Sequence, residues 1–331
     1  MKKRISVAMA LILAATGAMA STAMASAETE DAKATKDSGI VVGWLQKNQT
    51  NYFETVINDG GEALLEQYKK DGTVKEYYLF DGQTDASVQV TQATDMINLG
   101  VDVCILQPAE GEGCAPIVDM MNEAGIPVIE VNALTSNADE AAGFAGSDDV
   151  NAGEIMGQYI IDTLGDKGGY AHLQGIIGNS AEINRTQGIH NIMDKQSGWE
   201  MLDEQTAEWA ADKAAQFTND WLNLYGDKLN AIICDNDDMA VAAKLACIQA
   251  GREDVKCIGV DATEAALAMI ADGEGDASVF QNGTEQGRQA VEKAIKVVKG
   301  EKIESDYIPF ELVTKENISD YYNPNGETEA D

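Results

Sequence analysis

The sequence is poor in the residues that metal sites and hydrolase sites need. It contains only two histidines, His172 and His190, and no cysteine lies near either one at the spacing of metal ligands. It has no G-x-S-x-G segment, no serine beside a histidine and no Walker A sequence. We therefore expect no metal site, no cofactor and no enzymatic activity.

Basic residues are also scarce. The chain of 331 residues has 23 lysines and arginines against 56 acidic residues, which gives a formal net charge of −33. Such a charge repels nucleic acid and anionic lipid, and it disfavours an anionic ligand. We expect no nucleic-acid partner.

Long apolar runs are absent after the first 20 residues. Lys2, Lys3 and Arg4 precede an apolar run from Val7 to Ala20, and the small residues 25–27 then form an A-x-A site. This pattern predicts a cleaved signal peptide over residues 1–27, because the run is short for a membrane anchor. No cysteine lies near it, so we expect an exported, periplasmic protein without a lipid anchor.

The five cysteines form no C-x-x-C pair, and their odd number argues against a full disulfide framework. Three of them, Cys104, Cys234 and Cys257, fall in apolar runs typical of strands. A bridge between Cys234 and Cys257 is conceivable if their strands are neighbours. We favour buried free thiols, because free cysteine is among the most buried residue types.

Short β-branched runs alternate with amphipathic stretches along the chain, which favours parallel sheets joined by helical crossovers. Clear helices are expected at Thr84–Leu99 and Asp237–Ala250. The length suffices for two α/β lobes. The expected strands are Gly39–Leu45, Tyr77–Phe80, Val101–Leu106, Pro127–Val131, Gly143–Gly146, Tyr170–Gly175, Trp199–Glu204, Ala231–Cys234, Cys257–Val260, Ala277–Phe280 and Ile308–Val313.

The residues that directly follow these strands share one chemistry. Ligands of parallel sheets bind at the carboxyl ends of the strands, where this chain places amides, single carboxylates, one arginine and several aromatic residues. Amides and carboxylates satisfy hydroxyl groups, which both donate and accept, and aromatic faces suit the C–H patches of a sugar ring. The set therefore predicts binding of a polyhydroxylated ring.

Several segments resemble the periplasmic sugar-binding proteins of the type I fold, over about residues 39–313. Ala207-Glu208-Trp209, Asp235-Asn236-Asp237-Asp238-Met239-Ala240 and Gly259-Val260-Asp261-Ala262 resemble the glucose/galactose-binding branch. Leu173-Gln174-Gly175, with Arg185 ten residues later, fits both that branch and the ribose-binding branch. The resemblance implies two Rossmann-like lobes with parallel sheets and a three-crossover hinge.

The resemblance also implies the ligand-binding residues. Tyr52 or Phe53 would stack on one face of the sugar, and Trp209 on the other. The remaining implied ligand-binding residues are polar: Asn51, Gln107, Asn132, Asn179, Arg185, Asn236, Asp261 and Gln281.

Structural roles compete with some of these assignments. Trp209 could be a core residue, Arg185 a surface ion-pair residue, and Asn236 and Asp261 caps of the helices that follow them. Tyr52 and Phe53 are not separated by the sequence, and Thr50 and Asn51 share that ambiguity.

The sequence departs from both branches in its loops. The glucose/galactose branch has a histidine and an aspartate where this chain has Asn179 and Ala181, and the ribose branch has Asp-Arg in place of Asn132-Ala133. The segment Leu164–Gly169 is too short and too poor in acids for the calcium loop of the glucose/galactose branch. We expect no calcium.

The resemblance places the first lobe at residues 38–146 plus 282–308 and the second at 147–281 plus 309–322. It implies a monomer that delivers a neutral monosaccharide, with a hexose such as glucose or galactose favoured, to a membrane ABC permease. A pentose or other small polyol is the alternative ligand. A sugar-sensing protein that presents its ligand to a chemoreceptor or sensor kinase is the alternative role.

Overall fold

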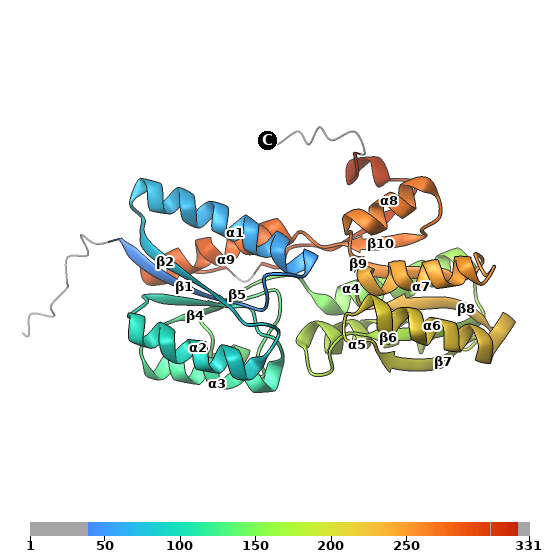
Figure 1. Ribbon diagram of the computed structural model, residues 1–331, viewed down its shortest axis with the longest axis horizontal. Coiled ribbons are helices and arrows are strands. Elements are labelled where there is room, and N and C mark those ends of the chain that lie inside the picture. The colour runs from blue at the N-terminus through green and yellow to red at the C-terminus, as the bar shows by residue number, and fades with distance from the viewer. Residues whose placement is uncertain (1–38, 305, 324–331) are drawn as a thin grey trace, which may run out of the picture. The chain divides into compact units, whose positions relative to one another are not determined.

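The computed structural model describes residues 39–304 and 306–323, so the predicted signal peptide lies outside the described residues. The described chain folds into two α/β lobes, each with one sheet between layers of helices (Figure 1). All eleven expected strands are present within this range. The fold class predicted from the sequence is thereby confirmed.

The first lobe is built on a parallel five-stranded sheet in the order β2-β1-β3-β4-β5. Helices α1 and α9 pack on one face, and α2 and α3 on the other. Its elements are β1 (Ile40–Gln46), α1 (Tyr52–Asp71), β2 (Val74–Asp81), α2 (Ala86–Leu99), β3 (Val103–Leu106), α3 (Gly111–Glu123), β4 (Val128–Val131), β5 (Gly143–Ala145) and α9 (Gly283–Val298).

The second lobe is built on a six-stranded sheet in the order β11-β10-β9-β8-β6-β7, in which only β11 is antiparallel to its neighbour. Helices α4 and α5 cover one face, and α6 and α7 the other. Its elements are α4 (Asp149–Leu164), β6 (Gly168–Gln174), α5 (Ser180–Met193), β7 (Trp199–Thr206), α6 (Ala211–Tyr225), β8 (Leu229–Cys234), α7 (Asp237–Gln249), β9 (Lys256–Asp261), α8 (Glu264–Asp272), β10 (Ala277–Phe280) and β11 (Glu311–Thr314).

The central strands are buried on both faces, which explains their continuous apolar runs. Strand β3, for example, is buried at every residue, Cys104 included. All five cysteines are buried free thiols in the structure.

The helix expected at Thr84–Leu99 begins two residues later than predicted. Gln83 and Thr84 have positive φ angles of 53° and 56°, which an α-helix does not accommodate. Asp85 then caps α2, because its carboxylate accepts hydrogen bonds from the backbone N–H groups of Ser87 and Val88.

The chain passes between the lobes three times: after β5, after β10 and after α9. Two of these connections lie side by side, since the Ile308 N–H donates to the Gly146 carbonyl at 2.9 Å. This arrangement brings the carboxyl ends of strands from both sheets to one region.

Candidate functional site: a polar cleft between the lobes

A cleft with about 510 Å³ of empty space, open solvent included, lies where the strands of both lobes end. Ten of the eleven residues predicted to bind ligand line it, and Gln107 does not. The lining consists of Lys47, Asn51, Tyr52, Phe53, Glu54, Asn132, Asn179, Ala181, Arg185, Trp209, Asn236, Asp238, Asp261, Thr263 and Gln281. The structure thus gathers residues that are as much as 234 positions apart in the sequence, from Lys47 to Gln281.

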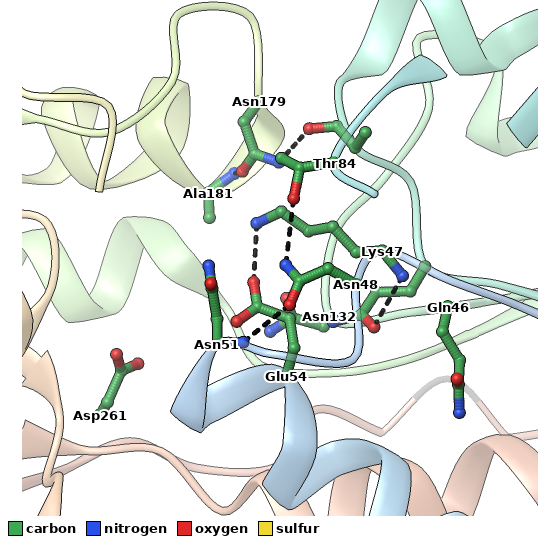
Figure 2. Close-up of polar contacts among 12 residues, drawn as sticks. Gln46, Lys47, Asn48, Asn51, Glu54, Thr84, Asn132, Asn179, Ala181 and Asp261 are labelled. Carbon is green, nitrogen blue, oxygen red and sulfur yellow. Dashed lines mark hydrogen bonds and ion pairs between the residues drawn. The ribbon is translucent and has the colours of Figure 1, made fainter. Parts of the chain in front are cut away.

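The loop after β1 is held by its own polar side chains (Figure 2). Asn48 donates to the Thr84 hydroxyl at 3.1 Å, and its carbonyl oxygen accepts from the Asn51 N–H at 2.8 Å. The Asn51 side chain makes no capping hydrogen bond to α1, although Asn51 is the N-cap residue. Its amide is therefore available to a ligand in the cleft.

Gln107 has a different role from the one implied by the resemblance. Its side chain is fully buried, and its Oε1 accepts from the backbone N–H of Lys47 at 3.3 Å. Because this contact fixes the start of the loop after β1, Gln107 shapes the cleft from behind and does not line it.

A lysine that the sequence analysis did not select lies in the cleft. Lys47 is 6% exposed, pairs with Glu54 at 2.9 Å, and its Nζ lies 5.5 Å from the centre of the Trp209 ring. Its position directly after β1 was the available signal. Glu54 could not be selected in this way. It lies in the first turn of α1, where acidic residues are common because they interact favourably with the helix dipole.

Three further lining residues were also missed as ligand-binding candidates: Ala181, Asp238 and Thr263. Asp238 lies in a segment that carries the resemblance, but it was not selected as a ligand-binding residue. Thr263 caps α8 through its hydroxyl, which accepts from the Ala266 N–H at 3.3 Å. Capping and lining coexist here, as they do at Asn236, whose side chain caps α7 by accepting from the Met239 N–H at 3.1 Å.

A chain of amides runs from the first lobe to the second. Asn132 donates to Gln286 at 3.1 Å and to Gln281 at 3.4 Å. Gln281 in turn donates to the carboxylate of Asp261 at 3.4 Å. These three cleft-lining side chains therefore constrain one another across the connection between β10 and α9.

Arg185 is a buried ion-pair residue, so the sequence reading of a surface ion pair is wrong. It is 3% exposed, its Nε and Nη2 each donate to Asp149 at 2.9 Å, and its Nη1 donates to the Asp235 carbonyl. Burial lowers the pKa of Arg185, but Asp149, Asp261 and Asp235 outweigh it and raise that pKa overall. The guanidinium therefore stays charged at the cleft.

Two glycines allow this placement of Arg185. A Cβ atom on Gly153 of α4 would lie 2.1 Å from the Arg185 carbonyl, and one on Gly188 of α5 would lie 2.1 Å from the Val150 carbonyl. Since these distances are far below van der Waals contact, only glycine lets α4 and α5 approach closely enough for Asp149 to meet Arg185.

The Trp209 ring is half-buried: it packs against the apolar core that the second-lobe sheet shares with α6 and α7, and it lies directly on backbone. A Cβ atom on Gly175 would lie 2.0 Å from the ring, so the indole packs directly on that glycine. The Arg185 guanidinium carbon lies 5.8 Å from the ring centre. The indole therefore lies beside a charged group of the cleft, and Trp209 is one of the residues that line the cleft.

Three lining residues have strained backbones. The φ angles of Asn132, Trp209 and Asp261 are 66°, 65° and 124°, in a region that non-glycine residues rarely adopt. Such strain costs about 1–3 kcal/mol per residue and concentrates at functional sites. Three of the seven described non-glycine residues with positive φ angles line the cleft, and two others, Glu208 and Ala262, adjoin lining residues in the sequence.

Asp261 is 9% exposed and its pKa is raised well above its ordinary value. Burial is the main cause, opposed by Arg185 and reinforced by Asp237, Glu54 and Asp238. Figure 2 shows Asp261 across the cleft from Asn51, with no direct contact drawn between them. The Asp261 carboxyl oxygens can accept hydrogen bonds from ligand hydroxyls.

Tyr52 and Phe53 both line the cleft but differ in surroundings. Tyr52 is 48% exposed, whereas Phe53 packs on the core of the first lobe and lies 3.1 Å from the position of a Cβ atom on Gly283. Which of the two stacks on a ligand stays open. Asn179 is buried, caps α5 through the Ala181 N–H and donates to the Ala109 carbonyl at 3.2 Å.

Beside the cleft, Asp237 gives the protein a pH-dependent stability. It is fully buried, accepts from the Thr263 N–H at 2.8 Å and from the Ser278 hydroxyl, and burial raises its pKa to about 7. Because the folded state holds this proton while the unfolded state releases it at about pH 4, the free energy of unfolding should fall as pH rises from about 4 to 7.

Asp237→Asn lacks this titrating group. Between about pH 4 and pH 7 its free energy of unfolding should therefore decrease by about 2–4 kcal/mol less than that of the original protein. Urea unfolding at pH 4.5 and 7.5 measures it, with the exposed Asp220→Asn as the matched control. An identical pH dependence in Asp237→Asn and the original protein would contradict the assignment.

Known proteins share this architecture. The family model of the periplasmic binding protein domain matches residues 42–302. A Rhizobium meliloti protein named for rhizopine binding is 35% identical over 281 residues, covering 82% of this chain and 89% of that protein. The xylitol-binding protein of Mycolicibacterium smegmatis is 33% identical over 267 residues, covering 80% of this chain and 76% of that protein.

Among solved structures, an ABC transporter solute-binding protein of Bacillus halodurans with bound myo-inositol superposes with a TM-score of 0.82. It is 33% identical and covers 87% of this chain and 99% of that chain. The fold and its cleft define a type I sugar-binding protein, as the resemblance predicted. The chain belongs to the periplasmic binding protein family.

The residues that the structure describes lack two other features. None of their helices has the length and apolar character needed to cross a bilayer. Nor do they contain a group of three or more histidine, cysteine or acidic side chains that could hold a metal ion.

Proposed function

We propose that this protein is the extracytoplasmic binding component of an ABC importer and that its cleft takes a small neutral polyol. The main support for this proposal is the arrangement of side chains around Trp209. The aromatic face lies beside Arg185, and the same cleft holds the Asp261 carboxyl and the amides of Asn132, Asn236 and Gln281. Each hydroxyl of a polyol needs a donor and an acceptor, and hydrogen bonds to charged groups contribute about 1.5–3 kcal/mol each.

A cyclic polyol, with an inositol as the first candidate, fits this proposal better than glucose or galactose. The solute-binding protein with bound myo-inositol and the xylitol-binding protein share about a third of their aligned residues with this chain. The loop residues Asn179 and Ala181 already differ from those of the glucose/galactose branch. Hexoses therefore serve as the comparison ligands.

Ligand binding would stabilise a closed arrangement of the lobes. Three contacts already join them beside the cleft: Asn179 to the Ala109 carbonyl, the Gly111 N–H to the Gly178 carbonyl at 2.9 Å, and the Leu134 N–H to the Ser180 hydroxyl at 2.7 Å. We infer that hinge opening breaks these contacts and that a ligand touching both lobes favours their formation.

The first test is a thermal-shift screen of residues 28–331, unfolded and refolded to remove bound ligand. We expect myo-inositol or a related polyol, at about 100 times its dissociation constant, to raise the melting temperature by about 5 °C. Glucose, galactose and ribose are the comparison ligands, and xylitol is tested together with the cyclic polyols. If neither polyols nor sugars shift the transition, the proposed ligand class is wrong.

A second test addresses the role in the cell. Deletion of the gene should abolish uptake of the identified polyol if the protein serves an importer. Loss of taxis with normal uptake would instead support the sensing role. Export to the periplasm through cleavage after residue 27 is part of the same proposal, and mass spectrometry of the secreted protein tests it.

A further inference from the structure

His172 of β6 is buried between two carboxylates outside the cleft lining. It is 1% exposed, its Nδ1 lies 3.0 Å from Glu204 Oε2, and its Nε2 lies 2.9 Å from Asp235 Oδ1. An ionised carboxylate oxygen accepts hydrogen bonds and has no proton to donate. Each ring nitrogen of His172 faces such an oxygen. Because a neutral imidazole carries a single N–H, only the doubly protonated ring satisfies both contacts.

The surroundings support that charge state. Burial lowers the pKa of His172, but Asp235 and Glu204 outweigh it and raise the pKa to about 9. The hydrogen bond from His172 lowers the pKa of Glu204. The other ionisable groups near this cluster are Tyr170 on β6, Glu182, Arg185 and His190 on α5, and Asp149 on α4.

Asp235 links His172 to the cleft. Its second carboxylate oxygen accepts from the Gly175 N–H at 2.8 Å, and its backbone carbonyl accepts from Arg185. Gly175 is the residue on which the Trp209 ring packs. A shift of Asp235 would therefore displace both the support of the aromatic face and a partner of the guanidinium.

We propose that protonated His172 is a positioning residue for the cleft: the Glu204–His172–Asp235 cluster fixes Asp235, and through it Gly175 and Arg185, so ligand affinity depends on the proton at His172. This inference rests on the proposed polyol-binding function. When the ring loses a proton, one of its carboxylate partners loses its donor and faces a lone pair. Asp235 is then free to move.

The test is the dissociation constant of myo-inositol between pH 6 and 10, measured by titration calorimetry. For the original protein we expect constant affinity up to about pH 8 and weakening of about tenfold as pH passes 9. Glu204→Gln removes one of the two attractive carboxylates, so the break should move to lower pH. His172→Gln should weaken binding about tenfold at pH 6 and abolish the break.

The control is Glu200→Gln, which removes an exposed carboxylate from the same strand β7. It should leave both the affinity and the break unchanged. If the pH at which affinity weakens is lower in Glu204→Gln, the titrating group is His172 and not a lysine that titrates at high pH. An unmoved break, or equal affinity in His172→Gln and the original protein, would overturn the proposal.

A second measurement decides the proposal even if myo-inositol does not bind. The chain has four tryptophans, and the indole N–H resonance of Trp209 can be assigned by its loss in Trp209→Phe. In the unliganded protein this resonance should shift with the same midpoint as the His172 ring resonances. Absence of myo-inositol binding contradicts the proposed ligand, whereas a Trp209 resonance that ignores the His172 titration contradicts the positioning role.

Discussion

Trp209→Ala should weaken polyol binding about 100-fold and also lower folding stability moderately. Large aromatic side chains in the centre of a binding site commonly contribute 2 kcal/mol or more, and 100-fold corresponds to about 2.7 kcal/mol. A stability loss of about 1–3 kcal/mol is expected as well, because the half-buried ring packs on Gly175 and against the apolar core of the second lobe. Titration calorimetry and urea unfolding measure the two quantities.

Two variants refine this result. Trp209→Phe keeps an aromatic face and should lose much less affinity than Trp209→Ala. Gly175→Ala keeps the indole but places a Cβ atom 2.0 Å from its present position, so it should also weaken binding. If Trp209→Ala binds the polyol as tightly as the original protein, the aromatic face is not part of the site.

The second large effect is expected at Arg185. Arg185→Met leaves the buried Asp149 without its ion-pair partner, and breaking a buried pair in this way costs about 3–5 kcal/mol. The variant should therefore lose both folding stability and polyol binding. Urea unfolding and titration calorimetry again measure them separately.

A double variant separates the two losses. Asp149→Asn removes the charge that Arg185→Met would leave unpaired, so the pair of substitutions should recover most of the stability. Binding should stay lost, because the cleft still lacks its guanidinium. Recovery of binding together with stability would show that Arg185 acts only through the fold and makes no contact with the ligand.

The sequence predicted the fold well because each central strand is buried on both faces and reads as an apolar run. The same rule located most of the cleft, since the residues at the ends of parallel strands converge. Trp209, Asp261 and Asn132 were found in this way. Their positive φ angles had no signal in the sequence, because none of them is a glycine.

The residues that the sequence did not reveal depend on partners far along the chain. Lys47 follows β1 directly, but its ion pair with Glu54 and its contact with the Trp209 ring are visible only in the structure. His172 lies in an apolar strand, and its carboxylate partners are 32 and 63 residues away, Glu204 on β7 and Asp235 directly after β8. Gln107 illustrates the opposite error: it follows β3 as a ligand-binding residue would, yet its side chain turns back to the loop after β1.

The most direct test of the account is a crystal structure of residues 28–331 with the polyol that stabilises the protein most. We predict one polyol molecule in the cleft, with its ring on Trp209 and its hydroxyls bonded to Arg185, Asp261 and the amides of both lobes. A polyol bound elsewhere, or a cleft ligand that avoids Trp209 and Arg185, would contradict the proposed site.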